Sequence, residues 1–226
     1  MNKVTLRFII IFVFLAGFAG QAQAPGEFYY ESEFDLSFPA KKNWSIDLSF
    51  GNRGMLLRRE NGTKTAGYQH SHIEFSQFTN YNFSEAAIIS LGLRYRFKEI
   101  FDATEADEFR IIEQLELENA KAPLSLSQRF RLEQRFKKKT EHRLRYELGF
   151  SRPINQVWSF GIDTEFLYTM AKHFKPEAEQ RFSIGLENEA FKNLEWEISL
   201  EYRLENYTRD LTHELFMVSG VNFILD

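Results

Sequence analysis

The chain contains no cysteine, only five prolines and twelve glycines, and no marked excess of charge of one sign. The absence of cysteine excludes a disulfide framework and any thiolate metal site. Sparse proline and glycine, together with 16% aromatic residues, exclude collagen-like and disordered chains. With 28 basic and 32 acidic residues, the net charge of -4 offers no basic excess for phosphates, so nucleic acid is not an expected partner. A length of 226 residues fits one domain.

One long apolar run is present, and it lies at the N-terminus. Lys3 and Arg7 precede apolar residues 8–18, and small residues follow at Gly20, Ala22 and Ala24. This order is typical of a secretory signal peptide. We expect residues 1–22 to be removed, because cleavage after Ala24 would leave Pro25 first; cleavage after Gly20 is the alternative. A retained anchor is the other interpretation, but 11 residues are fewer than the ~20 that a membrane helix needs.

Apolar and polar residues alternate with period two over most of the remaining chain. In 194–206, Leu, Trp, Ile, Leu, Tyr and Leu alternate with Glu, Glu, Ser, Glu, Arg and Glu. Only a strand separates such a pattern into two faces, although several of these residues favour helices. The pattern predicts eleven strands, at 27–38, 43–53, 68–81, 86–98, 108–119, 124–137, 140–152, 156–169, 179–190, 194–207 and 212–225.

The connections between these segments alternate in length. Short turns are expected at 39–42, 82–85, 120–123, 153–155 and 191–193, with mostly longer connections between them, such as 51–67 and 99–107. Thirteen residues rising ~3.3 Å each and tilted by ~40° cover roughly 33 Å, which exceeds the ~25 Å apolar band of an outer-membrane barrel. We therefore predict an all-β, antiparallel up-and-down transmembrane barrel of ten to twelve strands over 23–226.

The strand number itself conflicts with a general rule. Single-chain bacterial barrels have an even number of strands, and eleven would place the two termini at opposite rims. Either one predicted segment is not a membrane strand, or a further strand lies within 51–67.

Charged residues concentrate on one parity of the predicted strands, which we expect to face the lumen. An Arg or Lys turned towards lipid at mid-depth would cost about 2–4 kcal/mol. Opposite charges on neighbouring strands can then pair in ladders, either as structural filling or as a selectivity lining for a small polar solute. The predicted lumen ladder comprises Arg110, Glu116, Arg129, Arg131, Glu133, Arg135, Arg143, Arg145, Glu147, Asp163, Glu165, Arg181 and Glu187.

Candidate catalytic and metal-binding residues are few. His70 and His72 are spaced for a metal, but no third ligand is apparent. His213 and Ser219 share a strand face but stand six residues, or ~20 Å, apart, too far for a nucleophile and its base. We therefore expect no enzyme, no cofactor and no metal. The remaining enzymatic hypothesis, a lipid-modifying enzyme, would depend on Ser71, His72, His142 and His213.

The segments QRFRLEQRF at 128–136 and RLRYEL at 143–148 support a resemblance to a known family. Together they resemble a signature of an uncharacterised bacterial envelope family, a domain of unknown function predicted to form outer-membrane barrels. The resemblance extends over most of the chain after the signal peptide. It implies fold and location but carries no activity.

These observations predict an integral protein of the bacterial outer membrane, porin-like in form, with a structural or narrow-pore role. Its expected partners are outer-membrane lipid and the barrel-assembly machinery, and the default state is a monomer. The alternative is a secreted soluble β-barrel or sandwich that buries the apolar parity and binds a hydrophobic ligand.

Overall fold

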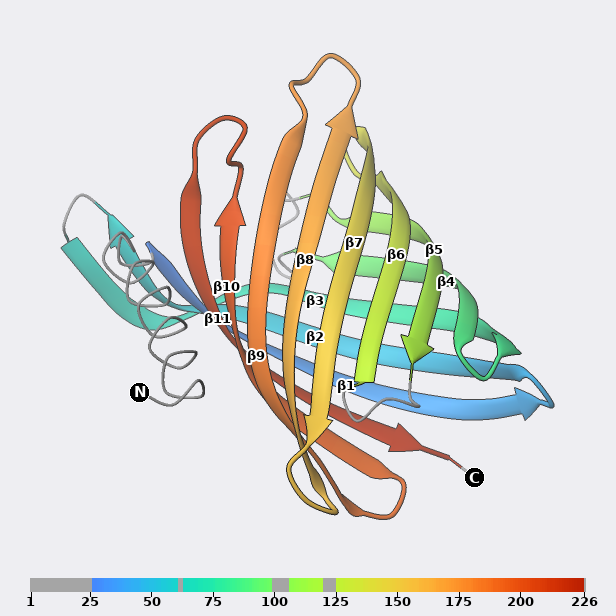
Figure 1. The fold of residues 1–226 in the computed structure, drawn as a ribbon. Helices are drawn as coiled ribbons and strands as arrows, with labels where there is room; N and C mark the ends of the chain where they lie inside the picture. Colours follow the sequence, from blue (N-terminus) through green and yellow to red (C-terminus); the bar gives the residue numbers. More distant parts are fainter. Residues whose placement is uncertain (1–25, 61–62, 99–105, 120–124, 226) are drawn as a thin grey trace, which may run out of the picture.

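The computed structural model describes residues 26–60, 63–98, 106–119 and 125–225. The predicted signal peptide, 1–22, lies outside the described residues. All regular structure within them is β-strand, wound into one barrel (Figure 1). No helix in this part of the chain is long and apolar enough to cross a membrane.

Eleven strands make up the described part of the chain, in the same order as the eleven predicted segments. Most boundaries lie within a few residues of the prediction, and the largest differences are in the second and third strands. The strands are β1 (Glu27–Lys41), β2 (Trp44–Glu60), β3 (Thr63–Ser84), β4 (Ala87–Phe97), β5 (Glu108–Asn119), β6 (Ser125–Phe136), β7 (Thr140–Pro153), β8 (Trp158–Ala171), β9 (Glu177–Phe191), β10 (Leu194–Glu205) and β11 (Thr212–Ile224).

The sheet closes on itself, and the closure departs from the expected pattern. Each strand pairs antiparallel with its sequence neighbour, whereas β1 and β11 pair in parallel from Glu27↔Glu214 to Ser37↔Ile224. Strands that alternate in direction can close an odd-numbered barrel only if the first and last run the same way. The predicted barrel of ten to twelve strands is therefore confirmed, but the expectation of an even number is wrong for the described residues.

A long hairpin of β2 and β3 occupies the segment in which a missing strand was suspected. Residues 51–60 continue β2 and residues 63–67 begin β3, and Glu60 pairs with Thr63. Register shifts interrupt their ladder between Arg53 and Gly54 and between Met55 and Leu57. The hairpin projects beyond the neighbouring strands at the left of Figure 1. Residues 51–60 and 63–67 are thus continuations of β2 and β3, and form neither a long loop nor a separate strand.

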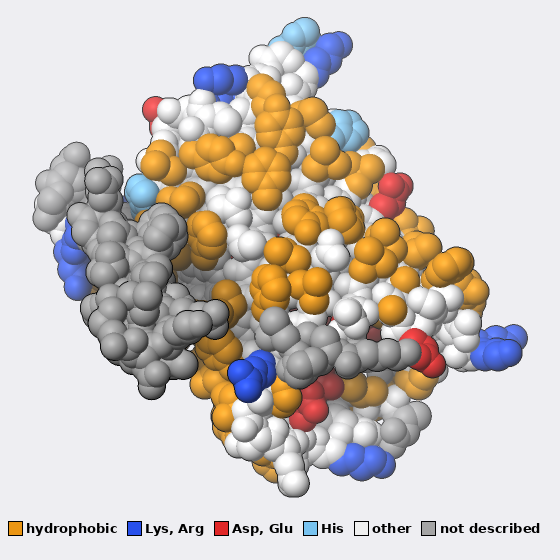
Figure 2. Space-filling view, viewed as in Figure 1, with side chains coloured by type: hydrophobic (Ala, Val, Ile, Leu, Met, Phe, Trp, Pro, Cys, Tyr) orange, Lys and Arg blue, Asp and Glu red, His pale blue; other side chains and the backbone are white. Residues whose placement is uncertain are grey.

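The outer face of the barrel is apolar and unpacked. Leu91 is 54% exposed, and Ile184 and Leu200 are each 49% exposed. Figure 2 shows hydrophobic side chains spread over the visible wall of the barrel. Two aromatic pairs, Trp44–Tyr81 at 4.8 Å and Trp158–Trp196 at 5.1 Å between ring centroids, lie beside the short turns. The soluble alternative requires this parity to be buried, and the structure places it outside.

Candidate functional site

The lumen contains a cavity of about 1030 Å³. Its lining includes Ser37 and Glu195, where β1 and β10 approach the short turns. It also includes Glu177 and Glu205, at the opposite ends of β9 and β10. The cavity therefore extends along the lumen from near one rim of the barrel to near the other.

The structure places the residues of the predicted ladder inside the barrel. Most of them line the cavity, and two lie behind this lining. Glu133 and Glu165 do not line the cavity but lie buried behind its lining, at 0% and 5% exposure. The residues that line it directly are Arg110, Glu116, Arg129, Arg131, Arg135, Arg143, Arg145, Glu147, Asp163, Arg181 and Glu187.

The two buried carboxylates, Glu133 on β6 and Glu165 on β8, bind arginines of the strands next to their own, β5, β7 and β9. Arg145 Nη1 lies 3.0 Å from Glu133 Oε1, and Arg145 donates to both oxygens of Glu165 at 2.7 and 2.8 Å. Two further arginines extend this network: Arg110 lies 3.6 Å from Glu133, and Arg181 lies 3.7 Å from Glu165. Charge-assisted and bidentate contacts of this kind fix the planes of guanidinium groups. The network therefore positions the arginines that face the cavity.

A further network comes from residues outside the predicted ladder. Glu31 accepts from Arg53 at 2.7 Å and lies 3.3 Å from Arg203 Nη2. Glu74 binds both Arg94 and Arg96, at 2.7 and 2.6 Å. A signal for these residues existed, because alternation in the predicted strands 27–38, 43–53, 68–81, 86–98 and 194–207 already puts their charges on one face.

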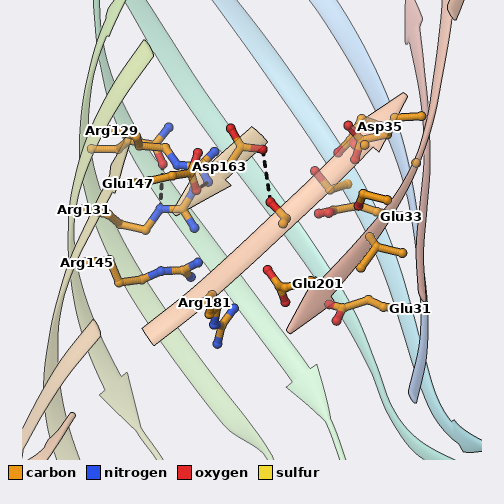
Figure 3. A pocket seen from close by; sticks show the side chains of 18 of the residues that line it. Glu31, Glu33, Asp35, Arg129, Arg131, Arg145, Glu147, Asp163, Arg181 and Glu201 are labelled. Atoms are coloured by element: carbon orange, nitrogen blue, oxygen red, sulfur yellow. Dashed lines mark hydrogen bonds and ion pairs between the residues drawn. The ribbon is translucent and has the colours of Figure 1, made fainter. Parts of the chain in front are cut away.

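The charges that line the cavity are unevenly divided around its wall. Among the described lining residues, β4 to β7 contribute eight arginines and two carboxylates, whereas the other strands contribute three arginines and thirteen carboxylates. Because the barrel is closed, β5 and β6 lie across the lumen from β1, β10 and β11. Figure 3 shows Arg129, Arg131 and Arg145 on one side of the pocket and carboxylates of β1 and β10 on the other.

The candidate metal pair is not assembled into a site. His72 is buried beside Glu74, with 3.8 Å between Nε2 and the carboxylate, and His70 is half-buried one register position away. In the ranges that the structure describes, no group of three or more His, Cys, Asp or Glu residues could hold a metal ion.

The candidate hydrolase residues have other partners. His213 Nδ1 lies 2.6 Å from the Tyr202 hydroxyl, and Ser219 Oγ lies 2.9 Å from the Tyr30 hydroxyl. Ser71 Oγ lies 3.3 Å from His72 Nδ1, but this imidazole is buried within the barrel. The structure does not bring His213 and Ser219 together.

Comparison with solved structures places the chain among porin barrels in fold. The NanC porin structure aligns with a TM-score of 0.52 at 15% identity and covers 87% of this chain and 97% of that one. An anion-selective porin from Comamonas acidovorans aligns with a TM-score of 0.40 at 13% identity, covering 84% of this chain and 54% of that one. No curated protein matches the sequence.

Comparison with family models identifies the relationship that the Arg and Phe alternation at 128–136 indicated. The model described as "Protein of unknown function (DUF2490)" matches residues 29–214, which span β1 to the start of β11. This confirms the predicted resemblance to an uncharacterised barrel family. The chain belongs to the DUF2490 family of proteins of unknown function.

Proposed function

We propose that this protein is an integral β-barrel of the bacterial outer membrane whose lumen forms a narrow channel for small polar solutes. The observation that carries the proposal is the polar cavity of about 1030 Å³ that extends between the two rims of a closed barrel. The N-terminal segment of the protein would act as the export signal. The barrel would be inserted as a monomer by the assembly machinery and surrounded by outer-membrane lipid.

The outer face supports the membrane part of this proposal. In water, the continuous apolar outer surface would remain exposed to solvent, whereas lipid tails solvate such a surface. A closed barrel also pairs all of its backbone hydrogen-bonding groups internally, as the bilayer requires. Ile198 and Leu200 of β10 point outward at 43% and 49% exposure, while Ser199 between them lines the lumen. This alternation matches the apolar-out, polar-in pattern of membrane strands.

Small side chains support the channel part. On the half of the lumen nearest the short turns, Ser and Gly recur in the wall between charged and larger residues, and their small size leaves space at the centre. The lining residues of this kind are Ser37, Ser45, Ser49, Ser90, Ser127, Ser151, Gly161, Ser183, Gly185, Ser199 and Gly220. Hydroxyl and charged groups at such a wall replace part of the hydration of a passing solute.

Single-channel recording in planar lipid bilayers tests the proposal. We expect the purified, refolded barrel to give discrete conductance steps. Ser199→Trp fills the lumen from β10 and should lower the step size by roughly twofold or more, because conductance follows the open cross-section. Ile198→Trp is the matched control, since it adds the same ring to the lipid face one residue away, and it should leave the steps unchanged.

One outcome of this recording would contradict the channel. A barrel that shows heat-dependent gel mobility, and is therefore folded, but yields no conductance steps would contradict the channel. It would instead assign the buried arginine and glutamate networks a purely structural role.

A further inference from the structure

The division of charge around the lumen suggests what kind of solute the channel would take. The basic sector of β4 to β7 and the carboxylates of β1 and β10 face each other across one cavity. Figure 3 shows Arg131 and Arg145 pointing into the pocket from one side and Glu33 and Asp35 from the other. In a confined site with low-dielectric walls, such an arrangement produces a field directed across the lumen.

On the basic side, Arg131 is incompletely compensated. Its Nε donates to Gln114 Oε1 at 2.6 Å, and its ion pair with Glu133 is long, at 3.9 Å. Glu133 is shared with Arg145, which approaches it more closely, at 3.0 Å. The guanidinium of Arg131 therefore retains positive charge that an anionic group in the cavity could meet.

On the acidic side, two carboxylates flank a glycine. Gly220 of β11 is in register with Glu33 of β1 and with Glu197 of β10, and all three line the cavity. Glu33 has 41% side-chain exposure and its ion pair, with Arg94, spans 4.0 Å. Within the described residues, Glu197 has no Arg or Lys nitrogen within 4.0 Å. Because Gly220 has no side chain, both carboxylates are accessible from the lumen.

From this arrangement we infer that the lumen favours zwitterionic solutes, small molecules with an ammonium and a carboxylate group such as amino acids or short peptides. The ammonium end would face Glu33 and Glu197, and the carboxylate end would face Arg131. A solute with a single charge is attracted by one wall and repelled by the other, and a neutral solute gains from neither. This inference rests on the proposed channel and goes further by assigning its solute class.

Uptake by proteoliposomes at neutral pH and low salt tests the inference with four molecules of similar size. Glycylglycine is zwitterionic, N-acetylglycinamide is neutral, glycylglycinamide is cationic and N-acetylglycine is anionic. At low solute concentration we expect glycylglycine to enter about three to ten times faster than the neutral probe, because both of its charges are stabilised in the lumen. Raising the ionic strength towards 1 M should shrink this ratio, since the screening length falls to about 3 Å.

Two substitutions locate the effect. Arg131→Gln and Glu33→Gln should each lower the ratio of zwitterion to neutral uptake by roughly twofold or more, and for the singly charged probes they should act in opposite directions. Matched controls are Arg152→Gln and Glu85→Gln, which remove the same charges from exposed positions that do not line the cavity, and they should leave the ratio unchanged. Heat-dependent gel mobility verifies that each variant is folded.

The results that overturn the inference differ from those that overturn the channel. Equal uptake of glycylglycine and N-acetylglycinamide, or a preference that survives both lumen substitutions, contradicts zwitterion selection while leaving a channel in place. Absence of uptake of all four probes together with absence of conductance refutes the channel and, with it, the inference.

Discussion

The two faces of the barrel wall are built from the same strands but serve opposite surroundings. On β10, Ile198 and Leu200 project outward and are 43% and 49% exposed, whereas Glu201 and Arg203 project inward and form an ion pair. A shift of one residue in sequence thus exchanges an apolar environment for a charged one. The outer face is therefore apolar, and the charged groups that could contact a solute lie on the inner face.

The buried charges of the inner face must also be paired for the barrel to be stable, a condition that does not apply to the apolar outer face. Glu133 is fully buried and lies within 4.0 Å of Arg110, Arg131 and Arg145. Burying a carboxylate is costly unless it is paired, and removing it leaves buried arginines without their counter-charge. The inward charges therefore depend on one another for their stability.

The largest expected effect comes from breaking the inner network. Glu133→Ala should lower the free energy of unfolding by about 3–5 kcal/mol, because it removes one partner of a buried ion-pair cluster. Glu177→Ala is the control: this carboxylate has 45% side-chain exposure and pairs with Arg209 at 3.2 Å, so its loss should cost about 0–1 kcal/mol. Urea unfolding in lipid vesicles, followed by tryptophan fluorescence, measures both. Equal losses would contradict the special role of the buried carboxylate.

A smaller effect should follow from placing charge on the outer face. Leu200→Arg puts a guanidinium in the lipid-facing band near the middle of β10 and should destabilise the barrel by about 2–4 kcal/mol. Ser199→Arg introduces the same group one residue away, into the lumen, and should cost much less. The same unfolding experiment compares them. If Ser199→Arg proved the more damaging, the assignment of the two faces would be wrong.

The sequence predicted the strands and their faces wherever alternation was unbroken. The segment predicted at 194–207 corresponds to β10 at Leu194–Glu205, and most of the Arg and Glu residues of one parity in 128–147 line the cavity. Period two is sufficient for this because each strand has one apolar face on the outside of the barrel and one polar face towards the lumen. Local pattern therefore determined most of the architecture.

The features that the sequence did not predict arise either from long-range strand pairing or from segments in which the alternation of polar and apolar residues is interrupted. The outer part of the β2–β3 hairpin was predicted as a long connection between two strands, because register shifts and the run Met55, Leu56, Leu57 interrupt the alternation that identifies strands. The parallel pairing of β1 with β11 joins segments about 190 residues apart, beyond any local signal. The partners of Glu74 and Glu31 likewise depend on strand register, so the sequence gives their face but not their ion pairs.

The most direct test of the central claim, a closed membrane barrel, is gel mobility of the protein extracted with detergent from the outer-membrane fraction. We predict that the protein is found in that fraction and that boiled and unboiled samples migrate differently, because a closed barrel resists detergent until it is heated. Recovery in the soluble periplasmic fraction, with identical mobility before and after boiling, would contradict it.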